Sequence, residues 1–435
     1  MNSKKGFSTL KVIVLVVIIL AIGGGVYYWQ KNKTEMQESK NLSNKEKYVA
    51  TQESKDPSNK KEENISLAKD LPICPVDTST LFTKPFMDGD KPDYITPLGN
   101  SNETGHVVPV DHVYPTDNGY EENVTVYAPG NLTLIWVENK QMHNKDTGAI
   151  TAADYQLNFA PCRGLNLAFI HLKTLSDRLK KAIGDENSNC NNDQKMDYGI
   201  QNGIPTYYVT CHPDIQKIKI SAGEIIGYFS GQSDKSNSGF DIGMYDYNKP
   251  ALGFINPDRY YKDTVHTACF ADYYIPELKA KYEEKFGAVD KPLGQYSTFI
   301  RRIIPPVCGK VMWDVAGTAS GNWFKNPIKQ VGINDNDALV LIHDNIQPEM
   351  AKMSWANVTS FIFAPTHNGS INREFSEVTA DGEIYCYQRE ENINSGNNGS
   401  KFLLQLVDDT HIKAERQPGV CGTSESFINP FTYER

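Results

Sequence analysis

The chain has 435 residues, 39% of them hydrophobic, and a formal net charge of −9 at pH 7. Its length predicts two or three domains, and its apolar content excludes a wholly disordered chain. The acidic total argues against a nucleic-acid binder, which needs a basic surface. The charge is uneven. Residues 1–70 contain 12 Lys+Arg and 8 Asp+Glu, a net +4, so the other 365 residues carry −13.

An uncharged apolar run covers residues 12–29. About 18 such residues are just long enough to cross a bilayer as a helix. Three lysines precede the run, and Tyr27, Tyr28 and Trp29 form an aromatic anchor at its far end. We therefore expect a single-pass membrane anchor with a cytoplasmic N-terminus and the bulk of the chain outside the cytoplasm. A cleaved signal peptide is the alternative.

The first 30 residues also resemble a type IV prepilin leader. Basic residues, Gly6 and Phe7 precede the long apolar run, and such leaders are cleaved after the glycine. The glutamate that normally lies five residues after the cleavage point is replaced by Lys11. This resemblance implies a pilin-like assembly subunit as another alternative, and it predicts processing after Gly6.

The region that follows the apolar run is polar. Residues 30–70 are rich in Lys, Glu, Asn and Ser and contain scarcely any apolar clusters. Such a segment cannot bury enough surface to offset the entropy of ordering it. We expect a flexible tether.

All eight cysteines lie beyond residue 70, and none forms a Cys-x-x-Cys pair. This spacing offers neither a zinc knuckle nor a thioredoxin-type motif. An even number of widely spaced cysteines outside the cytoplasm predicts disulfide bonds. Eight cysteines allow 105 sets of pairs, and the sequence does not choose among them. A catalytic pair at Cys211 and His212 is the alternative, although side chains of adjacent residues usually diverge.

The region from residue 71 to 257 is mostly β in pattern. Alternating apolar runs flank Pro129-Gly130, and two further strands lie within residues 157–171. A short helix is predicted at 175–183, because its apolar residues have helical spacing and Gly184 follows.

Ordered motifs in this region resemble the lysostaphin/LytM-type family of peptidoglycan zinc endopeptidases. The family has a His-x-x-x-Asp element, a Val-x-Ala strand, a Tyr-x-His-Leu strand, a Gly-x-x-Ile-Gly turn and a terminal His-x-His strand. The matching segments are Gly105-His106…Asp111, Val124–Ala128, Phe169–Leu172 and Ile220–Gly227. The resemblance covers roughly 150 residues and implies an antiparallel β fold.

The resemblance also implies a site. In the family, zinc is held by the His and Asp of the first motif and by the second His of the last motif. His106 and Asp111 would fill the first two places, although four residues separate them instead of three. Asp241 stands where the first His of the last motif belongs, and Gly243 stands where the ligand belongs. His171 matches the histidine that stabilises the transition state.

These departures predict a degenerate site. A catalytic zinc needs three protein ligands and an open position for water, and glycine offers no ligand. Asp241 as a substitute oxygen ligand keeps the enzyme alternative open. Each residue also has an ordinary structural role available. His106 and His112 could be loop residues, His171 could be a strand histidine, and Asp241 could cap a turn.

The C-terminal region begins with a helix predicted at 274–287 and continues with short strands. Strands are expected at 338–343, 360–363, 383–387 and 401–407, with hairpin turns at Asn368-Gly369 and Asp381-Gly382. This spacing predicts an antiparallel barrel or sandwich. His343, Asp344 and His367 could join a metal site, but residues of these types on hairpins usually face solvent.

The predicted organisation is therefore mainly β. It begins with a basic N-tail (1–11), an anchor (12–29) and a tether (30–70). A lysostaphin-like β domain (71–257), a linker with a helix (258–300) and a C-terminal β domain (301–435) follow.

We expect a membrane-anchored envelope protein whose peptidase-like domain is inactive and serves in binding, scaffolding or regulation. No cofactor is expected for this form, and its partners would be peptidoglycan or envelope proteins. The alternative is an active zinc endopeptidase with His106, Asp111 and Asp241 on the metal and His171 polarising the scissile bond.

Overall fold

The computed structural model describes residues 70–435 except 104, 118–122, 193–194, 202, 230–239, 291–297, 326–336 and 390–398. The expected anchor, the prepilin-like leader and all but the last residue of the expected tether lie outside the described residues. Within the described part of the chain, no helix is long and apolar enough to span a bilayer. The described residues belong to one compact unit, and the domain boundaries within it stay a prediction.

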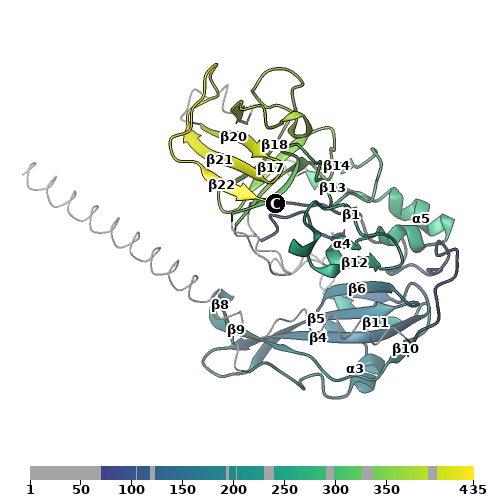
Figure 1. The fold of residues 1–435 in the computed structure, drawn as a ribbon. Helices are drawn as coiled ribbons and strands as arrows, with labels where there is room; N and C mark the ends of the chain where they lie inside the picture. The colour runs from purple at the N-terminus through teal and green to yellow at the C-terminus, as the bar shows by residue number, and fades with distance from the viewer. Residues whose placement is uncertain are drawn as a thin grey trace, which may run out of the picture. The chain divides into compact units, whose positions relative to one another are not determined.

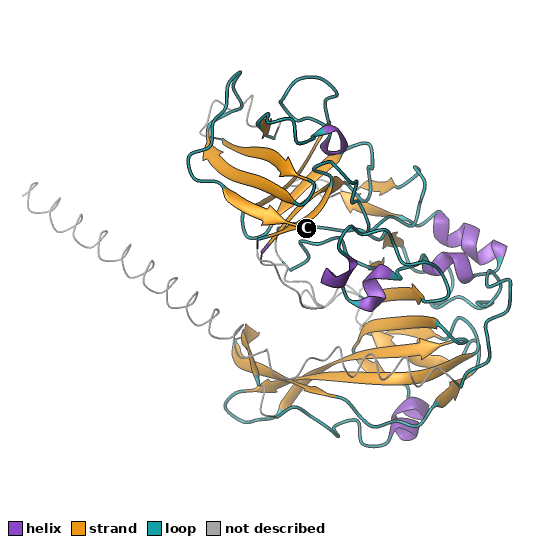
Figure 2. Ribbon diagram, in the orientation of Figure 1, coloured by secondary structure: helices purple, strands orange, loops and turns teal. Residues whose placement is uncertain are grey.

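Antiparallel strands dominate the described chain, which confirms the prediction of a mainly β protein (Figure 2). The larger sheet has nine strands, and its central strands β4, β5 and β6 lie side by side (Figure 1). In spatial order the strands are β1 (Tyr94–Thr96), β2 (His112–Thr116), β12 (Asp241–Asp246), β6 (Leu165–Leu172), β5 (Ile150–Ala160), β4 (Leu132–Asn144), β9 (Ile204–Cys211) and β8 (Met196–Gln201), with β10 (Ile218–Ile220) also paired to β4.

A three-stranded sheet accompanies the larger one. Its strands, in order, are β3 (Val124–Tyr127), β11 (Ile225–Phe229) and β7 (Thr174–Leu175). The predicted short helix follows as α3 (Asp177–Ile183), whose first turn is capped by the Ser176 side chain accepting from the Leu179 backbone N–H. Gly184 ends this helix at φ +82°, a conformation that glycine adopts without strain.

Short helical elements connect the two larger sheets. They are η2 (Pro257–Arg259), α4 (Lys262–Val265), η3 (Phe270–Tyr273) and α5 (Pro276–Glu283), followed by the hairpin β13 (Gly287–Asp290) and β14 (Thr298–Arg301). Helix α5 confirms the helix predicted around residues 274–287, and it begins with proline at its first position, where a missing N–H costs nothing.

The C-terminal sheet has eight strands and curves into a half-barrel. Its strands, in order, are β18 (Thr359–Phe363), β17 (Ala351–Trp355), β16 (Ala338–His343), β15 (Gly321–Phe324), β22 (Phe431–Glu434), β21 (His411–Pro418), β20 (Ser400–Asp408) and β19 (Tyr385–Tyr387). The 3₁₀ helix η5 (Phe375–Glu377) lies between β18 and β19. The prediction of hairpins at Asn368-Gly369 and Asp381-Gly382 is wrong, because neither turn joins two paired strands. Gly369 and Gly382 do turn the chain at positive φ, but each lies in the connection that contains η5.

The interior contains two large apolar clusters, and β16 contributes to both. Ala338, Val340 and Ile342 belong to the cluster formed mainly by residues 82–311. Leu339 and Leu341 belong to the cluster inside the half-barrel. Because successive side chains of a strand point to opposite faces, a continuous apolar run can pack on both sides. The C-terminal half-barrel is thus packed directly on the preceding region.

The prediction of disulfide bonds is confirmed. The pairs are Cys74–Cys162, Cys190–Cys211, Cys269–Cys308 and Cys386–Cys421, so each cysteine is bonded to its neighbour along the sequence. No cysteine of the chain is left free, which removes the alternative of a catalytic thiol at Cys211.

Candidate functional site

Three neighbouring strands of the large sheet bring together the residues singled out in the sequence. Strand β12 lies between β2 and β6, with Gly243 opposite His112 and Asp241 opposite Ile170. Asp241, Gly243 and Tyr245 share one face of β12, because side chains alternate along a strand. The site therefore depends on the order β2-β12-β6, which joins three segments more than 50 residues apart in sequence.

Asp241 is bonded to two histidines. One carboxylate oxygen, Oδ2, lies 3.4 Å from Nε2 of His112 and 3.3 Å from Nε2 of His171. The Asp241 side chain is only 4% exposed, whereas that of His171 is 34% exposed. A buried carboxylate shared by two imidazoles favours the protonated, positively charged form of both rings.

Each of these two histidines contacts a second carboxylate through its other ring nitrogen, Nδ1. Nδ1 of His112 lies 3.1 Å from Oδ1 of Asp111, and Nδ1 of His171 lies 2.9 Å from Oδ2 of Asp154. Asp111 is oriented in turn by Thr264, whose hydroxyl donates to Oδ2 at 2.6 Å. These five residues (Asp111, His112, Asp154, His171 and Asp241) are called the histidine–carboxylate network below.

The backbone around His171 is adapted to this contact. Between β5 and β6 the register shifts, so that Ile170 and His171 together face one residue of β5. This bulge places His171 at φ +67°, the left-handed region that costs a non-glycine residue roughly 1–2 kcal/mol. A bulge re-aims one side chain without disturbing the rest of a strand, and here the re-aimed side chain is the one that reaches Asp241 and Asp154.

The pKa values of the network follow from these bonds. Burial alone would lower the pKa of His112 and of His171, but hydrogen bonds to Asp111 and Asp241 raise that of His112 to about 9. Hydrogen bonds to Asp154 and Asp241 raise the pKa of His171 to about 10. Burial would raise the pKa of Asp241, but the two histidines lower it to about 2. At neutral pH the network therefore contains two imidazolium ions and an ionised Asp241.

Tyr245 fills the space beside Gly243. A Cβ atom placed on Gly243 would lie 2.5 Å from the Tyr245 hydroxyl, closer than any real contact. Burial, with further contributions from Asp111 and Asp263, raises the pKa of Tyr245 well above its usual value, so its hydroxyl stays neutral. Gly243, which the resemblance would place at the third zinc ligand, thus has no side-chain donor, and the Tyr245 hydroxyl takes the space beside it.

The network continues into a row of half-buried charges across the sheet. Lys140 on β4 lies opposite Asp154 on β5, and its Nζ is 3.2 Å from Oε1 of Glu138. Nε2 of His212 lies 3.9 Å from Oε2 of Glu138, and the His212 ring lies 5.5 Å from that of Trp136. With the network, Lys140 and Glu138 form a polar row that runs from β2 across β12, β6 and β5 to β4.

The remaining candidates lie elsewhere or take other roles. His106 is exposed and lies at the margin of the site, where its ring and the ring of His112 form an edge-to-face pair with centroids 6.1 Å apart. In the half-barrel, His343 is bonded to Glu374 at 3.0 Å and stacks on Trp313, whereas exposed His367 is bonded to Glu377 at 2.7 Å. The contacts of His343 and His367 in the described chain thus lie within the half-barrel or beside it, with Trp313, Glu374 and Glu377.

Sequence reasoning left His112 and Asp154 out of the site. His112 follows Asp111 directly, and a strand normally points adjacent side chains apart, so the pair gave no signal of a shared site. Asp111 precedes the first residue of β2, where the strand geometry does not yet hold. Asp154 matches no motif and is recognisable only from its place on β5, close to the β6 bulge.

Among the described residues, no three His, Cys, Asp or Glu side chains are arranged to hold a metal ion. The atoms that converge, Nε2 of His112, Nε2 of His171 and Oδ2 of Asp241, are paired with one another as ions. No protein-family model, curated protein or solved structure matches the chain. The site must therefore be interpreted from its own chemistry.

Proposed function

We propose that residues 71–257 form a non-catalytic, lysostaphin-like binding domain of a membrane-anchored envelope protein, which binds peptidoglycan peptides outside the cytoplasm. The observation that carries this proposal is the combination of Asp241 engaged by two histidines with the Tyr245 hydroxyl beside Gly243. They support the proposal because both imidazoles are paired with Asp241 and position 243 has no side chain to serve as a ligand.

Two costly features support a functional role for the network. His171 has a strained backbone, and Oδ1 of Asp241 is buried with no hydrogen-bond partner among the described residues. Unpaired buried oxygens and left-handed non-glycine residues both reduce stability, and both are concentrated at functional sites.

The polar row supports binding of a peptide. Lys140, Asp154 and His171 are each partly exposed and present alternating charges along the row. A peptide that carries both amino and carboxyl groups could pair with such a row, as stem peptides of peptidoglycan do. The four disulfides support an oxidising compartment, since such bonds are rare in the cytosol.

The test combines metal content, cleavage and binding of the full-length protein in detergent. We expect less than stoichiometric zinc after incubation with the metal, no cleavage of cross-linked muropeptides, and sedimentation with purified peptidoglycan. Asp154→Asn and Lys140→Ala should each weaken sedimentation at least several-fold. Lys413→Ala on β21, outside the row, serves as the matched control.

Two results would contradict the proposal. Stoichiometric zinc together with muropeptide cleavage would support the enzyme alternative. Sedimentation that is equal for the row variants and the wild type would remove the polar row from peptide binding. Loss of sedimentation in Lys413→Ala as well would show that the assay responds to damaged folding.

A further inference from the structure

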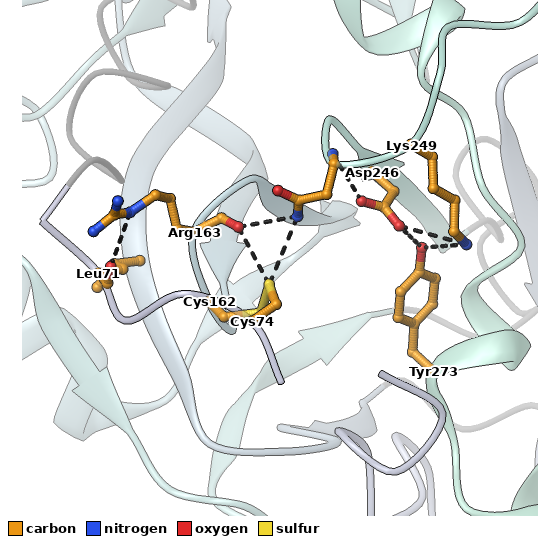
Figure 3. The surroundings of a disulfide bond; sticks show 8 residues. Leu71, Cys74, Cys162, Arg163, Asp246, Lys249 and Tyr273 are labelled. Atoms are coloured by element: carbon orange, nitrogen blue, oxygen red, sulfur yellow. Dashed lines mark hydrogen bonds and ion pairs between the residues drawn. A yellow bond between two sulfur atoms is a disulfide. The ribbon is translucent and has the colours of Figure 1, made fainter. Parts of the chain in front are cut away.

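The first described residues are attached to the turn between β5 and β6 (Figure 3). Cys74 is bonded to Cys162, which lies in this turn and 88 positions along the chain. The bond connects the start of the described chain directly to the middle of the large sheet. Everything N-terminal to Asp70, including the expected anchor and tether, joins the body at this place.

Non-covalent contacts reinforce the attachment. The backbone N–H of Arg163 donates to the carbonyl oxygen of Pro72 at 2.9 Å, and Arg163 Nε donates to that of Leu71 at 3.2 Å. Leu71 is 4% exposed and packs with Ile135 and Ala160 in a small apolar cluster of its own. Residues 71–74 are therefore held by a covalent bond, two hydrogen bonds and a buried side chain.

The turn that receives these contacts is itself fixed. Nδ2 of Asn248, just after β12, donates to the carbonyl oxygen of Arg163 at 3.0 Å. Gly164 turns the chain at φ +79°, and a Cβ there would lie 2.5 Å from the Asn248 side chain. Sγ of Cys74 lies 3.2 Å from the same carbonyl, a contact and not a hydrogen bond because a disulfide sulfur has no proton. The turn is thus tied to both β6 and β12.

We propose that residues 71–74 and the β5–β6 turn form a mechanical joint, through which tension on the N-terminal segment passes to β6 without loading residues 75–161. A pull that arrives at Cys74 continues through the disulfide to Cys162. Strands β1 to β5 lie in the loop that this bond closes. The loop contains Asp111, His112 and Asp154 of the network, whereas His171 and Asp241 follow the bond.

The joint matters because, without the disulfide, the same pull would act on residue after residue of the chain, starting from its N-terminal side. It would first extract Leu71 from its small cluster and would then pull residues 75–93, with the fully buried Phe82, Phe86 and Met87, out of the core before reaching β1. These contacts would break one after another, and this needs less force than breaking a whole sheet at once. The proposal requires only that residues 1–69 are attached to something that pulls, and it is independent of the binding function.

The experiment is single-molecule stretching of the full chain, held by handles at its two ends. At about 3.6 Å per extended residue, reduction of Cys74–Cys162 releases up to about 32 nm. The other three bonds close loops of 21, 39 and 35 residues and release at most about 14 nm each. The length of a step therefore identifies the bond.

We expect Cys74→Ala/Cys162→Ala to show, without reductant, an early low-force event and a total extension about 32 nm longer than wild type. Cys386→Ala/Cys421→Ala, the matched control, should lengthen the extension by about 13 nm and leave the first event unchanged. In wild type held at constant low force, a thiol reductant should release the 32-nm step before other steps. This measurement does not depend on how the variants fold.

Equal first-event forces in the wild type and in Cys74→Ala/Cys162→Ala would overturn the proposal, because the non-covalent contacts alone would then bear the load. A wild-type extension as long as that of the variant would also overturn it, since the loop would not be closed.

Discussion

Asp241→Asn tests whether the histidine–carboxylate network is held by charge. The substitution keeps the size of the side chain but removes the negative charge that Nε2 of His112 and of His171 face at 3.4 and 3.3 Å. Removing one partner of a buried ionic contact leaves the others uncompensated. We expect both histidines to lose much of their affinity for protons.

The structure sets the size of the effect. The pKa of His112 lies at about 9 against an ordinary 6.5, a difference worth about 3 kcal/mol at ~1.36 kcal/mol per pKa unit. Asp111 shares this stabilisation, so roughly half belongs to Asp241. His171 is one third exposed, and solvent screening limits its part to about 1 kcal/mol. We expect Asp241→Asn to lose about 2–3 kcal/mol of unfolding free energy at pH 6.

The pH dependence distinguishes charge from packing. A histidine with a raised pKa stabilises the fold fully below about pH 6.5, and this contribution is lost as the pH rises through about 9 for His112 and about 10 for His171. Asp241, with its lowered pKa, contributes above about pH 4 and loses this contribution toward pH 2. The difference between variant and wild type should therefore shrink toward pH 10.5.

The assay is urea unfolding at pH 6 and pH 10.5, together with NMR titration of histidines labelled at Cε1. Asp408→Asn is the matched control, because Asp408 also contacts a histidine, His411, but at the exposed surface. We expect little change in unfolding for this control at either pH. A loss for Asp241→Asn that is equal at both pH values, with unchanged histidine pKa values, would refute the electrostatic account.

Four further substitutions test the packing of the fold by thermal unfolding. Gly309→Ala should lower the free energy of unfolding by several kcal/mol, because its Cβ would lie 2.2 Å from a backbone oxygen. Gly382→Ala, at a similar φ but in open space, should lower it by only about 1 kcal/mol. Equal losses would contradict the steric argument. Ser176→Ala should cost about 1 kcal/mol through the lost cap of α3, and no effect would mean that water replaces the cap. Tyr433→Phe should cost about 1–2 kcal/mol, because Nε1 of buried Trp355 loses its acceptor at 2.7 Å; a neutral result would show that another acceptor moves in.

The sequence predicts most of the strands because their alternating or continuous apolar patterns are local properties. The turn at Pro129-Gly130 and the helix ended by Gly184 lie where expected. Strand β4, however, extends to Asn144, beyond the apolar run that ended the prediction at Val137. In its second half, Lys140 lies on the face of the polar row, whereas Gln141 points to the opposite face, where it is buried and donates to Asn187.

The candidate site was harder to predict because it depends on pairing and not on pattern. His171 and Asp241 were recognisable from the resemblance of their motifs, but their contact exists only because β12 pairs with β6. Asp154 becomes a partner of His171 through a bulge, which no periodicity reports. Likewise the obstruction beside Gly243 comes from Tyr245, two residues along the same strand, whose ring direction depends on tertiary packing.

Strand β16 has a consequence for cooperativity. Ala338, Val340 and Ile342 complete one apolar cluster, and Leu339 and Leu341 complete the other. If the half-barrel opened, the neighbouring cluster would lose these three buried side chains, and the apolar side chains packed against them would become exposed to water. This exposure costs about 25 cal/mol of free energy for each Å² of apolar surface. The two halves of the body should therefore melt in one calorimetric transition, and a fragment cut at residue 257 should aggregate.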